Sequence, residues 1–151
     1  MPPRGFSANW AETGNTLDGG CLCGGIRYRL RRLPTDVAHC HCATCRRSTG
    51  APFVTWATLP RADVALLRGT PKGYRSSSHA TRWFCPDCGA QLFLDDDGEA
   101  TVDIAAAGLD QPDRLTPRYN TYTHGRLAFV NGFDASLADD PEDGIGTAPR
   151  R

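Results

Sequence analysis

Seven cysteines provide the clearest chemistry in this sequence, and they fall into three short clusters. The first and the last read GGCLCGG and FCPDCGA, with two cysteines each, whereas the middle one, AHCHCATC, holds three. Thiolates gathered this closely are typical metal ligands, and an all-sulfur set selects zinc over hard cations. Because a closed zinc site takes four ligands, seven thiols indicate one closed site and a second site with three.

Two cysteine pairs are suited to the closed site. Cys21 and Cys23 form a C-x-C pair, and in a strand the alternation of side chains would point both sulfurs to one side. Cys85 and Cys88 form a C-x-x-C pair, and Gly89 supplies the permissive backbone that a tight turn needs. Together the pairs predict a structural zinc that joins two distant segments. The alternative, four reduced cysteines buried without metal, is disfavoured by the two tight pairs beside glycines.

The three remaining cysteines predict a more open metal site. Cys40 and Cys42 are expected to share one face of a strand, and Cys45 returns to them if a helix begins at Ala43 or Thr44. Three protein ligands with an open fourth position are typical of a catalytic zinc. The N-terminal end of such a helix would favour thiolate over thiol.

Two arginines, Arg46 and Arg47, follow the third cysteine of this cluster directly. Their guanidinium groups would also favour thiolate, and they could bind a substrate carboxylate through paired hydrogen bonds. The alternative is that both belong to a solvated helix face. We therefore treat Arg46 and Arg47 as candidate substrate contacts.

The four histidines are weaker candidates. His39 and His41 alternate with the cysteines around them, so they are expected to face away from the metal as packed or hydrogen-bonded residues. Either could still close the second site if the strand is irregular. His79 and His124 lie in loop-like surroundings and are expected at the surface, although His124 could approach the site from the C-terminal segment.

Composition excludes several partners and suggests a compartment. The 17 basic and 17 acidic side chains cancel and no Lys/Arg-rich block stands out, so neither nucleic acid nor an anionic membrane is an expected partner. The sequence has no apolar run of spanning length and no signal-like start. An odd number of cysteines argues against a complete disulfide framework. We therefore expect a cytoplasmic protein, where clustered cysteines more often bind metal.

Eight short runs rich in Val, Ile, Thr and aromatic residues predict strands, because turn residues separate them. They are 25–30, 37–42, 53–59, 64–69, 81–85, 91–95, 100–106 and 118–123. One short helix is expected over 43–49, and a helical turn near 109–114. Strands at this spacing indicate a mainly β fold, either a sandwich or a folded sheet. The polar residues 1–16 suggest a flexible lead-in and the acidic, Gly/Pro-containing residues 136–151 a flexible tail, which leaves 17–135 as the zinc-binding domain.

Three stretches in order, GGCLCGGIRY, CHCATCRRSTGAPF and RWFCPDCGAQLF, resemble the glutathione-dependent formaldehyde-activating enzyme family, also known through the related domain of centromere protein V. The resemblance covers about residues 18–133. It implies complex folded sheets of short antiparallel strands built around zinc sites, similar to B-type methionine sulfoxide reductases. It also implies two zinc ions per chain. The structural ligands would be Cys21, Cys23, Cys85 and Cys88, and the catalytic ligands Cys40, Cys42 and Cys45.

The activity that the resemblance implies is that of a carbon–sulfur lyase, S-(hydroxymethyl)glutathione synthase in the founding case. A small thiol such as glutathione would bind the open zinc through its sulfur and add to an aldehyde such as formaldehyde, or the reverse. One stretch departs from the family, which often carries P-x-x-H-I-W near its C-terminal strand. Here the sequence reads PRYNTY, with Tyr119, Asn120 and Tyr122, so this part of the pocket is expected to differ.

Two other functions stay open from the residues alone. A zinc-stabilised protein-binding module without catalysis would need the second site closed, for example by His39, His41 or a partner residue. Metal sensing or storage is disfavoured because a closed four-cysteine site is hard to empty.

Overall fold

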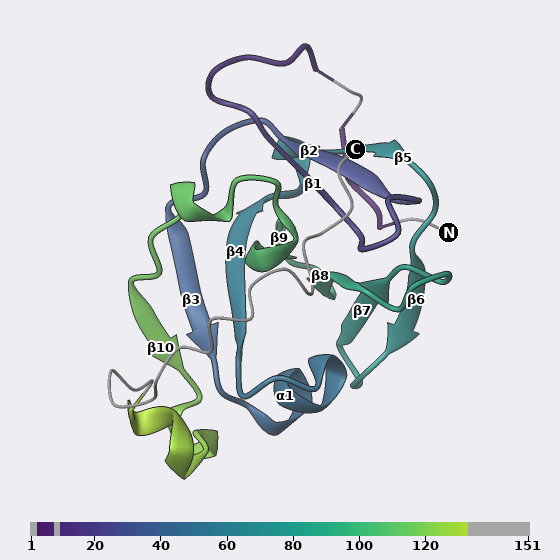
Figure 1. The fold of residues 1–151 in the computed structure, drawn as a ribbon. Helices are drawn as coiled ribbons and strands as arrows, with labels where there is room; N and C mark the ends of the chain where they lie inside the picture. The colour runs from purple at the N-terminus through teal and green to yellow at the C-terminus, as the bar shows by residue number, and fades with distance from the viewer. Residues whose placement is uncertain (1–2, 8–9, 133–151) are drawn as a thin grey trace.

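In the described part of the chain, two β-sheets and one short helix make up the fold (Figure 1). The computed structural model describes residues 3–7 and 10–132, and the predicted tail over 136–151 lies outside them. The smaller sheet has the strand order β1-β2-β5, with β1 at Leu17–Gly20, β2 at Arg27–Leu30 and β5 at Val64–Arg68.

The larger sheet has seven strands in the order β10-β3-β4-β9-β8-β7-β6. Its strands are β3 (Asp36–Cys40), β4 (Val54–Pro60), β6 (Lys72–Arg75), β7 (Ala80–Phe84), β8 (Gln91–Asp96), β9 (Thr101–Ala105) and β10 (Tyr119–Thr121). The helix α1 spans Ala43–Thr49, and short 3-10 turns occupy Arg61–Asp63, Ala106–Gly108, Pro112–Arg114, Thr123–Gly125 and Ala128–Gly132. Within the described part of the chain the fold is mainly β, as predicted.

The predicted elements match the structure closely, with two omissions. Each of the eight predicted runs overlaps one strand, with bounds that differ by at most two residues at either end, and α1 has the predicted bounds. The sequence missed β1, whose LDGG is half glycine, and β6, whose four residues are all exposed. Neither carries the alternation of apolar and polar residues on which a strand prediction depends. One pairing also differs from the expected antiparallel arrangement, because β10 runs parallel to β3.

The main core lies between the two sheets. Tyr28 of the small sheet packs edge-on against Phe93 of β8, with ring centroids 5.0 Å apart. Phe6, from the predicted lead-in, packs against the same ring. Since side chains alternate along a strand, the next residue, Leu94, points to the opposite face and packs in a second cluster with Cys45 and other buried residues. Strand β8 therefore links the core to the site described below.

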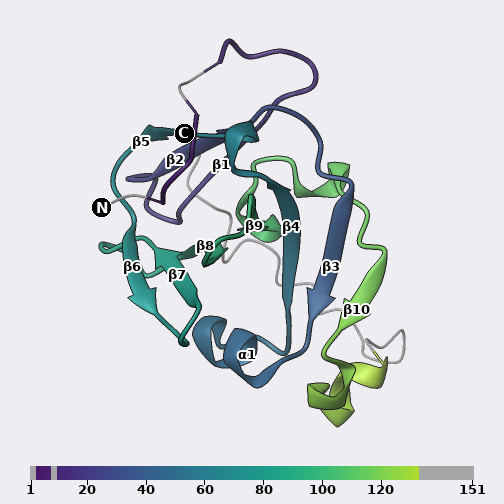
Figure 2. The ribbon, with the colours of Figure 1, turned by 180° about the vertical axis from the view of Figure 1, so that it is seen from behind.

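The helix α1 lies at the end of the large sheet that is opposite the small sheet, as both views show (Figures 1 and 2). It connects β3 to β4, so it positions its residues next to the ends of two central strands. None of the described residues belongs to a helix that is long and apolar enough to span a membrane.

Candidate metal centres and active site

Four cysteines form a compact group, called here the four-cysteine cluster: Cys21, Cys23, Cys85 and Cys88. Their sulfur atoms all lie within 4.8 Å of one another. Two of the separations are 3.5 Å, between Cys21 and Cys23, and 3.8 Å, between Cys23 and Cys85. Zinc–sulfur bonds of about 2.3 Å in a tetrahedron place neighbouring sulfurs roughly 3.8 Å apart. The cluster therefore fits a closed zinc site.

Two tight turns bring these sulfurs together, and one of them differs from the prediction. Cys21 and Cys23 do not lie in a strand, because β1 ends at Gly20 and the chain turns there. Gly24 adopts a φ of 78°, which glycine tolerates at low cost. The turn directs the Ile26 N–H to the Cys21 sulfur at 3.2 Å. The sulfurs still converge, but through a turn rather than through strand alternation.

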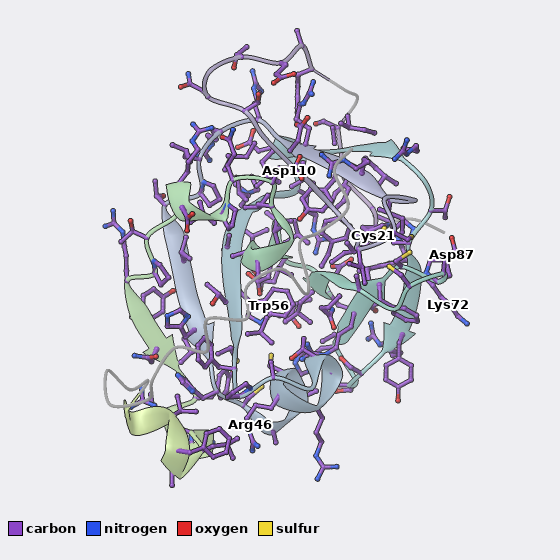
Figure 3. The ribbon with its side chains drawn as sticks, viewed as in Figure 1. Cys21, Arg46, Trp56, Lys72, Asp87 and Asp110 are labelled. Carbon is purple, nitrogen blue, oxygen red and sulfur yellow. The ribbon has the colours of Figure 1, made fainter. Side chains whose placement is uncertain are left out.

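The second turn follows the prediction. Gly89 has a φ of 75° and its N–H donates to the Cys85 carbonyl at 2.9 Å. Cys85 is fully buried, whereas Cys23 on the opposite turn is exposed. Figure 3 shows Cys21 on one side of this centre and Asp87, from the turn between the paired cysteines, on the other. A metal held here would join the small sheet to the end of β7.

Cys40, Cys42 and Cys45 form the three-cysteine cluster, whose sulfurs also lie within 4.8 Å of one another. Cys40 ends β3, and Cys45 lies in α1. The prediction that Cys42 lies in the strand is wrong. Cys42 is instead the N-cap of α1 and has an extended backbone. Its sulfur accepts the Cys45 N–H at 3.3 Å. The start of the helix therefore sets the spacing of the second and third thiols.

Two donors from distant strands contact Cys45. The indole Nε1 of Trp56 lies 3.4 Å from the Cys45 sulfur, and Nη2 of Arg82 lies at the same distance. The pKa of the Cys45 thiol is lowered to about 5, first by its interaction with the Cys40 thiol and then by Trp56 and Arg82. The pKa of Cys40 is raised by the same interaction and by burial. The surroundings therefore favour a thiolate at Cys45.

A fourth protein ligand is lacking among the described residues, because no His, Asp or Glu atom joins the three sulfurs. His39 Nδ1 lies 2.8 Å from the Thr55 hydroxyl, and His41 Nε2 lies 2.8 Å from the Asn120 side-chain oxygen. Both histidines are thus hydrogen-bonded to other side chains and neither belongs to the group of three sulfurs, in agreement with the prediction of hydrogen-bonded residues. Three thiolates within reach of one another fit a zinc that keeps one position for a substrate.

The three-cysteine cluster opens on a cavity of about 420 Å³, called here the thiol cavity. Six residues that matter for its chemistry are Cys40, Cys42, Cys45, Arg82, Asp103 and Tyr122. His79 also lines it as an exposed residue, and His124 lies outside it beside Tyr122. Tyr122 has a φ of 52°, a strained value for a residue with a side chain.

A second cavity of about 570 Å³, called here the arginine cavity, adjoins the first. It is lined by Arg47 and Tyr74, and it shares Thr44, Ser76 and Arg82 with the thiol cavity. Arg46 lines neither of these two cavities. Its Nε instead donates to the His41 carbonyl at 3.3 Å, and Figure 3 shows it at the outer side of α1. Of the two predicted arginines, Arg47 alone reaches a cavity next to the thiols.

The sequence did not indicate Arg82, which is only 6% exposed. Its Nη1 donates to the Ser48 hydroxyl at 3.3 Å, while its Nε is buried without a hydrogen-bond partner. Buried charges are normally paired, and Arg82 has the Cys45 sulfur where a carboxylate would usually be. The signal that could have identified Arg82 is its position two residues after Ala80 in a strand. Alternate residues of a strand share one face, and here that face is buried.

These features define a mainly β protein with one closed four-thiol centre and one open three-thiol centre beside a cavity. The sequence model of the glutathione-dependent formaldehyde-activating enzyme family matches residues 16–125, and the chain belongs to this family. A Schizosaccharomyces pombe protein named as an uncharacterized lyase is 34% identical over 77 residues, which are 51% of this chain and 56% of that protein. The alignment thus spans little more than half of that relative.

A solved structure has the same architecture. The crystal structure of a Rhodobacter sphaeroides protein matches with a TM-score of 0.57 and 26% identity, covering 69% of this chain and 99% of that one. Family membership is thus shown, and both cysteine clusters could hold metal ions.

Proposed function

We propose that the chain is a zinc-dependent carbon–sulfur lyase that adds a small, glutathione-like thiol to an aldehyde such as formaldehyde and catalyses the reverse cleavage. The observation that carries this proposal is the three-cysteine cluster, which lacks a fourth ligand among the described residues and opens on the thiol cavity. Cys40, Cys42 and Cys45 would hold the catalytic zinc, and the four-cysteine cluster the structural one. A bound zinc would lower the pKa of a substrate thiol.

The arrangement of arginines supports a thiol with an acidic group. Arg47 and Arg82 line the arginine cavity, and Arg82 also borders the thiol cavity. A substrate whose sulfur lies at the three thiols could therefore extend past Arg82 and place a carboxylate near Arg47. Guanidinium–carboxylate pairs are strong and directional. We assign the substrate-binding role to Arg47, whereas Arg46 holds the backbone at His41.

Titration of the two-zinc protein with glutathione and with its serine analogue tests this function. We expect glutathione to bind at least about tenfold more tightly, because the hydroxyl of the analogue is a poor ligand for a thiolate-bound zinc. Arg47→Ala should weaken binding without releasing metal, and Arg46→Ala serves as the matched control. Thiol–aldehyde turnover is then measured on the same samples. Equal binding of the two ligands would show that the sulfur does not reach the metal.

The second candidate is a protein-binding module in which every zinc is structural. It requires a closed second site, which the hydrogen-bonded His39 and His41 do not provide. Failure of any small thiol to bind would favour this candidate. Under either function we propose a cytoplasmic location, because the seven cysteines form no disulfide and metal-binding thiolates must stay reduced, as they do in the cytosol.

A further inference from the structure

Asp103 of β9 lies on the same face of the large sheet as the three-cysteine cluster. Its partners across the sheet are Thr58 on β4 and Leu94 on β8. Trp56 lies two residues before Thr58, so both point to one face, and the Trp56 indole contacts the Cys45 sulfur. Asp103 also lines the thiol cavity itself. A carboxyl group and the three thiols therefore share one cavity.

Among the described residues, the Asp103 carboxyl has one hydrogen-bond partner and no cationic partner. The Thr58 hydroxyl donates to its Oδ1 at 2.6 Å, and within the described ranges no arginine, lysine or histidine forms an ion pair with it. A partly buried carboxylate without a counterion is costly. By contrast, the guanidinium of Arg82 in the same cavity is already engaged by Cys45 and Ser48.

Several charged or titratable groups face Asp103 across the sheet and the cavity. They are Asp36 of β3, Cys45 of α1, Arg82 of β7, Asp96 of β8 and His79 before β7. Burial raises the pKa of Asp103, and the negative charges of Asp96 and Asp36 raise it further, whereas the Thr58 hydroxyl lowers it. The environment therefore makes this carboxyl a better proton acceptor than an exposed aspartate.

We infer that Asp103 is a further catalytic residue, which carries the proton between the substrate sulfur and the aldehyde oxygen. This inference rests on the proposed function. The Asp103 carboxylate takes the proton of the substrate S–H, and the sulfur electron pair forms the C–S bond. The C=O π electrons move to the oxygen, which takes the proton back from Asp103. The product is a hemithioacetal, the carboxylate is regenerated, and no other reactant is needed.

The same path runs in reverse for cleavage. Asp103 takes the hydroxyl proton of the hemithioacetal, the C–S bonding pair returns to sulfur, and the departing thiol regains the proton. Both directions start from an ionised Asp103 in the free enzyme. The value of kcat/KM should consequently fall in both directions as pH drops through the pKa of Asp103.

Two variants test the inference. Asp103→Asn keeps the shape but cannot accept a proton, so kcat should fall about 100-fold or more, the effect of losing a general acid–base group. Glutathione binding measured by calorimetry and zinc content should stay at wild-type values. The matched control is Asp110→Asn, which removes an exposed carboxylate paired with Arg27 outside the thiol cavity.

Thr58→Val removes the hydroxyl that stabilises the ionised form of Asp103. The acid limb of the kcat/KM profile should therefore move to higher pH, a shift that a merely structural role of Asp103 would not produce. If Asp103→Asn does not fold, the pH profile of Thr58→Val still tests the catalytic role of Asp103.

Wild-type turnover in Asp103→Asn, or an unmoved limb in Thr58→Val, would overturn the inference while leaving the proposed function intact. A wild-type protein that neither binds thiol nor turns over would overturn both.

Discussion

Nη2 of Arg82 and the sulfur of Cys45 lie 3.4 Å apart, although 37 residues separate them in the chain. The contact joins β7 to α1 across the second cysteine cluster. Both side chains are buried, so their charges attract each other in a medium of low dielectric constant. A zinc ion bound by three thiolates would have a net negative charge. The guanidinium of Arg82 beside them would balance this charge.

This contact predicts that Arg82 controls the metal affinity of the three-cysteine cluster. Arg82→Met should weaken the second zinc about 10- to 100-fold, the usual effect of removing a group that contacts a metal ligand. Arg82→Lys should lose less, because it keeps the charge but not the planar fork. Competition with a chromophoric chelator measures the affinity. Arg75→Met, which removes an exposed arginine from β6, is the control. Unchanged affinity in Arg82→Met would contradict the prediction.

The cysteine clusters were predictable because ligands within each pair are close in sequence. A spacing such as that of Cys85 and Cys88 constrains the local backbone whatever the rest of the fold does, and Gly89 marks the turn. The predicted strand conformation at Cys42 was wrong, because β3 ends at Cys40 and Cys42 caps the helix α1. The grouping survived this error, since an N-cap brings its side chain back to the first turn.

Arg82 and Asp103 were not predictable in the same way. They reach the thiols only through the strand order β4-β9-β8-β7, which brings four segments to one sheet face. Each is a single charged residue within a strand. The alternation of side chains along a strand does not show which face of the sheet will border a cavity. Long-range register, rather than residue type, places both of them.

The two clusters should differ in their effect on stability. Cys85→Ser removes a ligand that joins the end of β7 to the turn after β1, and structural zinc binding contributes folding free energy directly. We expect its melting temperature to fall by roughly 10 °C or more, and that of Cys42→Ser by about 3 °C or less. Thermal unfolding followed by circular dichroism makes the comparison. Equal losses would show that the structural and catalytic roles are divided wrongly.

The turn that carries Cys21 and Cys23 depends on close backbone contact with Gly69. Gly69 has a φ of 76°, and a Cβ at this position would collide with the carbonyl oxygen of Gly25. Gly69→Ala should therefore combine a left-handed strain of about 1–2 kcal/mol with an overpacking cost of about 1–3 kcal/mol.

Gly50→Ala is the matched control, because Gly50 has a similar φ of 66° but open space around it. Urea unfolding should show that Gly69→Ala loses more free energy of unfolding than Gly50→Ala. Similar losses in the two variants would mean that the turn carrying Cys21 and Cys23 moves away from the new methyl group without a loss of stability.

Zinc should leave the two clusters at different rates. The three-cysteine cluster has an exchangeable position on the thiol cavity, where a chelator can enter, whereas four thiolates leave no open position. A metallochromic indicator with excess chelator should therefore record one fast and one slow zinc ion per chain. Cys42→Ser should remove the fast phase and keep the slow one. The two-site division fails if the fully loaded protein releases all its zinc in a single phase, or if Cys42→Ser abolishes the slow phase instead.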